Sequence, residues 1–396
     1  MDTISNKHGK KLGSVIGFAI TVGIGFLIYI LLINIKVETS WLDYNTIVAN
    51  AHSNLFYKTV WYIMNFTEAQ FYAGFFASLG VILGGFVAWR LDVKDSKYAG
   101  FNVSYGSNLW PWVFASQLLT LFISIFILGF TRYFEMGYTW LPTFIMVVGA
   151  PPAIMLIYGP NVKALFTGSI LGAFMGFPVA MWISDYILPV IDVPGVVSNV
   201  FTMAITGIII AAICNVLPWM EKMPSKPIER REKNKDNELE YMHKPLWFIR
   251  RVFADFSEAQ FYGNEIAGLF VIFGASLDWI LNMNHGAYGS GVIPAIILSQ
   301  IIGSAVGVFL YFSKFVDSGW YGTYVPVVSV GPASVLMFGG TIQVAVLAGI
   351  LGGIIGPPMA EYFCSKLKEG YHPTIGNVTS MGVTTIIVTT ILKIIL

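Results

Sequence analysis

The sequence has few charged residues for its length. Asp, Glu, Lys and Arg make up 11% of its 396 residues, whereas hydrophobic residues make up 56%. Soluble domains carry about 25% charged residues. The few charges of this chain are therefore not enough to coat a soluble globule of this size. Lipid is therefore the expected solvent for much of the surface. This composition predicts an all-α polytopic membrane protein.

Other absences exclude further classes of protein. The net charge of +1 creates no field that would attract nucleic acid. Two cysteines and five scattered histidines form neither a disulfide framework nor a set of metal ligands. No glycine-rich phosphate loop, HExxH or CxxC motif occurs. We therefore expect no enzymatic activity, no cofactor and no nucleic-acid partner.

Long apolar runs are the dominant feature that is present. A membrane span needs about 20 mostly apolar residues. Eleven segments fit this requirement, at about 13–35, 71–90, 110–130, 140–158, 162–185, 197–217, 263–282, 291–312, 322–339, 342–362 and 376–395. The first is longer than the apolar core of a signal peptide, so we interpret it as an uncleaved helix.

The distribution of Lys and Arg predicts the orientation. With the amino terminus in the cytoplasm, 19 of the 23 Lys and Arg residues lie on the cytoplasmic side of these spans. Positive residues favour the cytoplasmic side of a membrane. We therefore expect a multi-pass protein of the cell (inner or plasma) membrane, with a cytoplasmic amino terminus and an external carboxyl terminus.

The chain contains two related halves. The segment Phe66–Tyr72 reads FTEAQFY, and Phe256–Tyr262 reads FSEAQFY. Other matches follow in the same order, namely Tyr105-Gly106-Ser107 with Tyr288-Gly289-Ser290, Ser116-Gln117 with Ser299-Gln300, Thr143 with Thr323, Pro152-Ala153 with Pro332-Ala333, and Asn199 with Asn377. Five predicted spans separate matching positions. Because five is odd, the second copy should be inverted in the membrane.

The duplication predicts four regions. Residues 1–54 form an amino-terminal membrane helix and an external segment, and residues 55–217 form the first repeat. Residues 218–243 form a charged cytoplasmic linker, and residues 244–396 form the second, inverted repeat. Each repeat should begin with an amphipathic helix on the membrane surface, at Leu55–Gln70 and Leu246–Gln260. The Glu-Ala-Gln element that ends each stretch is interpreted first as a cap or anchor and second as a gating element.

This 5+5 inverted repeat resembles, in architecture alone, the urea channels and the membrane component of sugar phosphotransferase systems. Inverted repeats are also typical of secondary transporters, whose substrate sites lie near the midplane between the repeats.

Prolines interrupt two equivalent spans. Ala150-Pro151-Pro152 and Val330-Gly331-Pro332 fall in the middle of apolar runs. Proline removes a backbone donor and clashes with the preceding turn, so each helix should break there. The new half-helix would aim its positive end at the midplane, which suits a carboxylate or another anionic group. The alternative is a packing kink.

The candidate substrate contacts are polar and helix-break residues, most of them present in both copies. They are Ser116, Gln117, Pro152, Ala153, Asn199, Thr202, Ser299, Gln300, Pro332, Ala333, Ser334, Asn377 and Ser380. The alternative is that the polar side chains only join helices. Glu265 and Asp278 lie in the seventh span, where the first copy has Phe75 and Ala88. Carboxylates inside spans are candidate ion-coupling sites; a carboxylate at the membrane interface is the alternative.

These features predict a secondary active transporter of a small polar solute, including anionic ones, that works by alternating access. Its expected partners are the lipid bilayer, the solute, a coupling H⁺ or Na⁺, and further copies of the chain in a homo-oligomer. The alternatives are a passive channel or facilitator, and a membrane component of a phosphotransferase-type or other multi-subunit complex.

The inverted repeat predicts the exposure of two equivalent loops. Cysteines introduced at Gly106 and Gly289 should react with a membrane-impermeant thiol reagent from opposite sides of the membrane. Labelling of both from one side would contradict the inversion.

Overall fold

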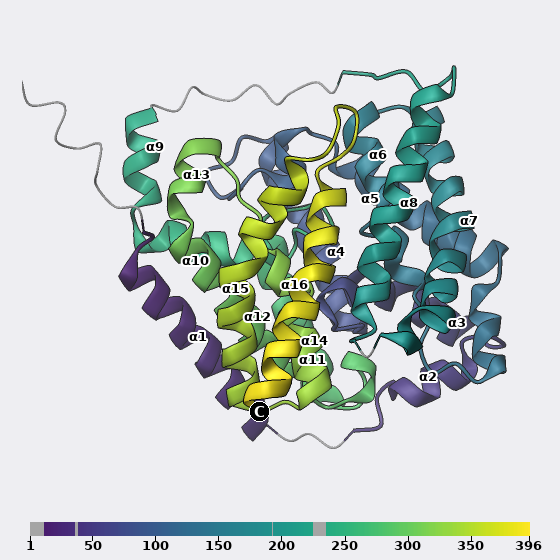
Figure 1. The fold of residues 1–396 in the computed structure, drawn as a ribbon, viewed down its shortest axis with the longest axis horizontal. Helices are drawn as coiled ribbons and strands as arrows, with labels where there is room; N and C mark the ends of the chain where they lie inside the picture. Colours follow the sequence, from purple (N-terminus) through teal and green to yellow (C-terminus); the bar gives the residue numbers. More distant parts are fainter. Residues whose placement is uncertain (1–11, 36–38, 192, 225–234) are drawn as a thin grey trace, which may run out of the picture.

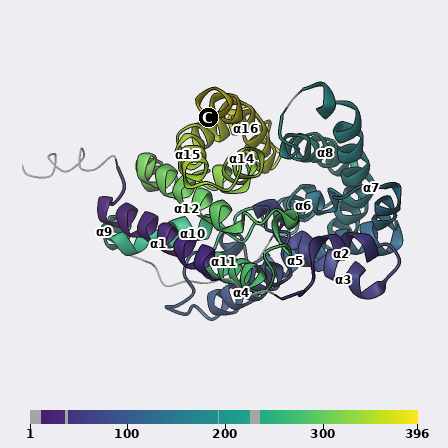
Figure 2. The same ribbon diagram turned by 90° about the horizontal axis from the view of Figure 1, so that it is seen from below.

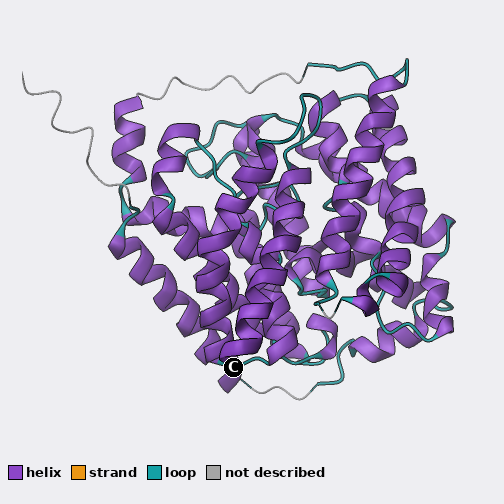
Figure 3. Ribbon diagram, in the orientation of Figure 1, coloured by secondary structure: helices purple, strands orange, loops and turns teal. Residues whose placement is uncertain are grey.

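The computed structural model describes residues 12–35, 39–191, 193–224 and 235–396. Helices dominate this part of the chain, and no strand occurs within it (Figure 3). The prediction of an all-α protein is therefore confirmed for the described residues.

Eight helical segments are long and apolar enough to cross a membrane. They are Val15–Asn34, Phe75–Val93, Trp110–Ile127, Val162–Val190, Val196–Val216, Ile293–Leu310, Ile342–Cys364 and Thr374–Ile395. The other three predicted spans coincide with shorter helical segments, Thr143–Tyr158, Glu265–Leu281 and Val325–Phe338. Length and composition thus support a polytopic membrane protein with eight candidate spans among the described residues.

The first half follows the order of its predicted spans. Its helices are α1 (Val15–Asn34), α2 (Tyr44–Asn50), α3 (Leu55–Met64), η1 (Asn65–Gln70), α4 (Phe75–Val93), η2 (Val103–Gly106), α5 (Trp110–Phe122), η3 (Ile123–Ile127), η4 (Phe130–Met136), η5 (Thr143–Met146), α6 (Ala150–Tyr158), α7 (Val162–Tyr186), η6 (Leu188–Val190) and α8 (Val196–Val216).

The second half has a similar series. Its helices are α9 (Lys235–Met242), α10 (Pro245–Asp255), α11 (Glu265–Leu281), η7 (Ala287–Gly289), α12 (Ile293–Leu310), α13 (Phe312–Ser318), η8 (Val325–Val328), α14 (Val330–Phe338), α15 (Ile342–Cys364) and α16 (Thr374–Ile395). The carboxyl-terminal ends of α16 and α8 lie at opposite ends of the bundle (Figure 1).

Helices α4 and α11 form the most extensive contact between the halves, and they run antiparallel. The carboxylate of Asp278, near the end of α11, accepts hydrogen bonds from the amides of Phe76 and Ala77 at the start of α4, at 2.9 and 2.8 Å. Two glycines allow the close approach, because a Cβ on Gly80 would collide with the Phe270 carbonyl and one on Gly274 with the Phe76 carbonyl. Small residues allow such close backbone contacts between membrane helices.

The predicted helix breaks are confirmed at both positions. The 3₁₀ turn η5 ends before Gly149, and α6 then starts with prolines in its first turn. In the second half, η8 ends at Val328, and Ser329, with φ −148° and ψ −86°, separates it from α14. Proline suits the first turn of a helix because the amide that it lacks has no helical partner there.

The amphipathic stretches differ from their prediction as surface helices. The start of each is exposed, at Leu55 and Leu246, but both stretches then enter the protein core. All of η1 is buried, and so are residues 251–265. The polar groups at the ends of both stretches find partners in the opposite half, and this contact draws them away from the surface.

Helix α1 lies beside α10 and α12, at the edge of the second half (Figures 1 and 2). Gly17 faces the Phe248 ring of α10, and Gly25 faces Ile301 of α12. The amino-terminal helix therefore packs on the second half, although it precedes the first in sequence.

We expect Gly274→Ala to destabilise the protein, because the added methyl group would push α4 and α11 apart. Overpacking of this kind costs about 1–3 kcal/mol. The unfolding temperature in detergent should fall for this variant. Gly23→Ala in α1 is the matched control, because no atom lies within 4 Å of its Cβ position. Equal unfolding temperatures for the two variants would contradict the close α4–α11 contact.

Candidate functional site

The two seven-residue elements Phe66–Tyr72 and Phe256–Tyr262 meet in the protein interior. Each contains a left-handed residue at the same position, Phe71 with φ 64° and Phe261 with φ 66°. The side chains of Gln70 and Gln260 donate to each other, with N–O distances of 2.6 and 2.8 Å. The contact between the halves is therefore reciprocal at its centre.

Gln117 and Gln300 extend this reciprocal contact. The Gln117 amide donates to the carbonyls of Val147 and Gln260, at 2.8 and 3.1 Å. The Gln300 amide donates to the carbonyls of Val327 and Gln70, at 2.7 and 3.0 Å. Each glutamine binds one carbonyl beside a helix break in its own half and one carbonyl in the opposite half.

Two tyrosines complete the same network. The Tyr262 hydroxyl donates to the side-chain oxygen of Gln117 at 2.9 Å, and the Tyr72 hydroxyl donates to that of Gln300 at 2.5 Å. Both glutamine side chains are fully buried. A buried amide needs this complete set of partners, because an unpaired one is costly. The network therefore holds both breaks and both halves together.

A central cavity of about 40 Å³ lies beside this network. Its lining comes from both halves in equivalent pairs, namely Glu68 and Glu258, Ala69 and Ala259, Phe71 and Phe261, Tyr105 and Tyr288, Phe144 and Tyr324, Val148 and Val328, Val196 and Thr374, Val200 and Val378, and Met203 and Met381. Asn199 lines it without its equivalent, Asn377. The volume accommodates one or a few water molecules.

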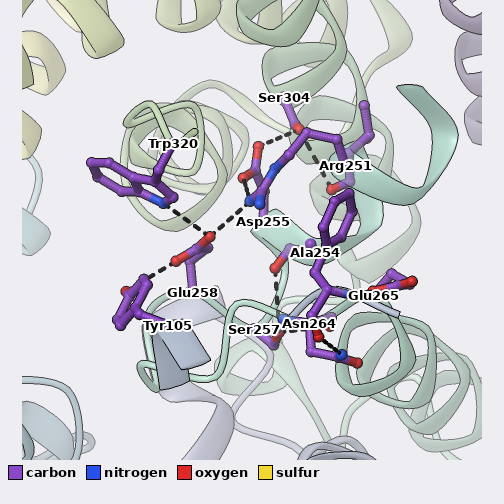
Figure 4. A network of polar contacts seen from close by, with 12 residues as sticks. Tyr105, Arg251, Ala254, Asp255, Ser257, Glu258, Asn264, Glu265, Ser304 and Trp320 are labelled. Atoms are coloured by element: carbon purple, nitrogen blue, oxygen red, sulfur yellow. Dashed lines mark hydrogen bonds and ion pairs between the residues drawn. The ribbon is translucent and has the colours of Figure 1, made fainter. Parts of the chain in front are cut away.

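Glu258 belongs to a buried charge network (Figure 4). Arg251 lies between two carboxylates, 2.5 Å from Asp255 and 2.7 Å from Glu258. The Tyr105 hydroxyl and the Trp320 indole donate to Glu258, at 3.0 and 3.2 Å. The charge of Glu258 is therefore compensated by one guanidinium and two further donors.

Glu68 has the equivalent donors but lacks the cation. The Trp140 indole donates to Glu68, as does the Tyr288 hydroxyl. Trp140 precedes Trp320 by 180 residues, the same offset as between Thr143 and Thr323. Each Trp–Glu–Tyr triad therefore takes its tyrosine from the opposite half.

The cavity communicates unequally with the two ends of the bundle. A vestibule of about 500 Å³ is lined by Phe71, Trp140, residues 193–196, Asn199, Tyr288, Ala333, Leu336 and Met337. It shares Phe71, Val196, Asn199 and Tyr288 with the central cavity.

A narrow pocket of about 20 Å³ occupies a corresponding position toward the other end. Its lining includes Ala153 and Ile157, the equivalents of Ala333 and Met337, together with His372 and Thr374. His372 lies in the loop between α15 and α16, at the end of the bundle away from the carboxyl terminus (Figure 1). The larger of the two pockets therefore lies toward the end that carries the carboxyl terminus.

The structure places the predicted substrate contacts in several environments. Asn199 lines the cavity and the vestibule, Ala333 lines the vestibule, and Ala153 lines the narrow pocket. Pro152 and Pro332 lie in the first turns of α6 and α14. Asn377 contacts Tyr324 and Cys364, and Ser334 is buried without a hydrogen-bond partner among the described residues.

The remaining hydroxyl groups bond within their own helices. Ser116 donates to Val113, Thr202 to Ser198, Ser299 to Ile296, and Ser380 to Asn377, each to a backbone carbonyl three or four residues earlier. Together with Gln117 and Gln300, these residues lie outside the lining of the central cavity.

The two predicted coupling carboxylates hold structural contacts. Glu265 forms an ion pair with Arg250 at 2.7 Å and accepts a hydrogen bond from the Phe101 amide at 2.8 Å. Asp278 caps α4 and lies 3.3 Å from His285. Neither residue lines one of the three cavities described above. Their role in coupling stays a prediction.

The sequence analysis did not include Glu68 and Glu258 among the candidate site residues. It interpreted the Glu-Ala-Gln element as structural first, whereas both carboxylates line the central cavity. The available signal was an acidic residue repeated within an otherwise apolar, aromatic element. Among the described residues, no group of three His, Cys, Asp or Glu side chains is placed to hold a metal ion.

We expect Gln117→Ala to lower stability strongly. The substitution leaves the Val147 and Gln260 carbonyls and the Tyr262 hydroxyl without this partner, and each unpaired buried group costs about 1–3 kcal/mol. Thermal unfolding of the purified protein measures the loss. Ser116→Ala is the matched control, because its hydroxyl bonds only within α5. A Gln117→Ala protein of normal stability that has lost solute transport would instead favour a substrate contact.

No protein-family model matches the sequence, and no curated protein matches it. Any function must therefore be argued from the site itself.

Proposed function

We propose that this protein is a secondary active transporter of a small polar solute, built as a 5+5 inverted repeat and working by alternating access. The proposal rests on the different volumes of two pockets that lie at corresponding places in the two halves. The vestibule measures about 500 Å³, and the corresponding narrow pocket about 20 Å³. A transporter that alternates its access must have one such side open while the other is closed.

Reciprocal contacts support the inverted repeat. Gln70 pairs with Gln260, and the contacts of Gln117 with the second half repeat those of Gln300 with the first. A two-fold relation between the halves produces this pattern of exchanged partners. An axis in the membrane plane agrees with the antiparallel α4 and α11. Eleven crossings would additionally require the segments Thr143–Tyr158, Glu265–Leu281 and Val325–Phe338 to cross.

The location of the central cavity supports a solute site. Substrate sites of inverted-repeat transporters lie between the repeats, where broken helices contribute their ends. Here Val148 and Val328, next to the two breaks, both line the cavity. Irregular backbone at membrane depth requires such a protein-lined or wet environment.

The charges of the lining favour a neutral, zwitterionic or cationic solute over an anion. The starts of α6 and α14 each contribute about half a positive charge. Glu68 and Glu258 contribute two carboxylates, and the nearby guanidinium of Arg251 is shared with Asp255. The aromatic rings of Phe71, Phe261 and Tyr324 would also suit a positive group. The proposed solute is therefore neutral, zwitterionic or cationic.

The proposed orientation follows the positive residues. The linker at 218–243 and the loop that holds His372 would face the cytoplasm, and the vestibule would face the outside of a cell membrane. The structure would then represent an outward-facing form.

Uptake by proteoliposomes tests this proposal. Single small polar solutes are first screened for thermal stabilisation of the purified protein, and each stabilising solute is then offered to the vesicles. We expect accumulation above the external concentration under an imposed proton or sodium gradient, and simple equilibration without one. Equilibration under all conditions would identify a passive facilitator. Stabilising solutes that never enter the vesicles would contradict transport.

Two equivalent positions report the access in the same vesicles. Met337→Cys and Ile157→Cys, in a background without Cys214 and Cys364, place thiols in the vestibule and in the narrow pocket. A membrane-impermeant thiol reagent should modify the first from the external side much faster than the second from the cytoplasmic side. The transported solute should reduce this difference in rates. Rates that are equal and insensitive to the solute would contradict alternating access.

A further inference from the structure

The two carboxylates of the central cavity have the same donors and different charges around them. Arg251 and Asp255 accompany Glu258, whereas the equivalent positions near Glu68 hold Trp61 and Asn65. In the first half the network is neutral. The Trp61 indole donates to Thr143 at 3.1 Å, and Thr143 donates to Asn65 at 2.7 Å.

Glu68 is therefore a buried carboxylate without a cation. Its side chain is 2% exposed, and none of the ion pairs among the described residues includes it. Glu68 lies in η1, outside the eight candidate spans. Burial raises the pKa of Glu68 above its usual range, and the hydrogen bonds from Trp140 and Tyr288 only partly oppose this rise.

The triad around Glu68 accepts a proton without rearrangement of the backbone. The Trp140 indole is only a donor, so it stays on one carboxyl oxygen in both protonation states. The Tyr288 hydroxyl is a donor and an acceptor, so it can accept from the other oxygen once that oxygen is protonated. A sodium ion fits less well, because it needs several oxygen ligands and the indole offers none.

The hydrogen-bond partners of the two carboxylates reach different surfaces, since Tyr105, beside Glu258, is 45% exposed outside the vestibule. Trp140 and Tyr288, the two partners of Glu68, both line the vestibule. The partners of Glu258, Trp320 and Tyr105, line neither the vestibule nor the narrow pocket. The uncompensated carboxylate is thus the one whose partners line the vestibule.

We propose that Glu68 is the residue that binds and releases the coupling proton of this protein, with Glu258 as a fixed, Arg251-paired anion across the cavity. The coupling role of Glu68 rests on the proposed transport function, whereas its binding of a proton does not. In this arrangement, the first half carries the exchangeable charge and the second half the permanent one.

Several titratable groups surround this site. Tyr288 of η7 hydrogen-bonds to Glu68, and Tyr44 of α2 lies near it. Burial is the largest cause of the raised pKa of both tyrosines, and the negative charge of Glu68 adds to it. Across the cavity lie Glu258, Tyr105 and Tyr324. Tyrosines remain neutral around pH 7, so a protonation change there reports a carboxyl group.

Infrared difference spectroscopy of the full-length protein in lipid tests the proposal without any solute. The bulk pH is lowered from alkaline to neutral, a range in which ordinary carboxyl groups stay ionised. We expect a protonated-carboxyl band that shifts on ¹³C labelling of glutamate and is lost in Glu68→Gln. Glu265→Gln, in which an Arg250-paired carboxylate is removed, is the matched control and should retain the band. A band that persists in Glu68→Gln would overturn the proposal.

A second pair of variants leaves both glutamates in place. Trp140→Phe removes a donor that favours the ionised form of Glu68, so the midpoint of the band should move to higher pH by about one unit. Trp320→Phe, its equivalent beside Glu258, should leave the midpoint unchanged. An unmoved midpoint in Trp140→Phe, or a midpoint that depends on sodium chloride relative to choline chloride, would contradict proton binding at Glu68. Failure of uptake together with a normal titration would remove only the transport proposal.

Discussion

The structure depends on the pairing of backbone groups that are freed where helices break. A break inside a membrane protein leaves carbonyls that lipid cannot satisfy. In this chain the amides of Gln117 and Gln300 satisfy those of Val147 and Val327. The same two amides also bind carbonyls of the opposite half, at Gln260 and Gln70. One kind of side chain thus stabilises the breaks, joins the halves and fixes the position of the cavity between them.

The two halves keep this framework and differ in charge. Both have a Trp–Glu–Tyr triad at the cavity, but only the second has a buried arginine and a second carboxylate beside it. A buried carboxylate is stable as an anion only when a cation or several donors compensate it. Replacement of Arg251 and Asp255 by Trp61 and Asn65 at the equivalent positions therefore leaves Glu68 chemically distinct from Glu258. The two halves thus hold carboxylates with similar donors and different surrounding charges.

The unequal vestibule and narrow pocket give the same asymmetry on a larger scale. Ala153 and Ile157 in the narrow pocket are equivalent to Ala333 and Met337 in the vestibule, so related positions of the two halves have different surroundings. The uncompensated carboxylate and the open vestibule lie on the same side of the central network, which links the proposed proton site to the proposed path of the solute.

The sequence alone determined the all-helical membrane class and the helix breaks, because composition and proline have strong local consequences. It singled out Gln117 and Gln300 as candidate substrate contacts, whereas only the structure placed them in the network between the halves. It did not place Glu68 and Glu258, since an amphipathic pattern ending in Glu-Ala-Gln also fits a helix on the membrane surface. Their burial depends on partners far along the chain, such as Tyr105 for Glu258, 153 residues away. The absence of a cation beside Glu68 likewise became visible only when Trp61 and Asn65 were placed in space. Local pattern decides which segments leave water, whereas contacts between distant segments decide which buried charges remain uncompensated.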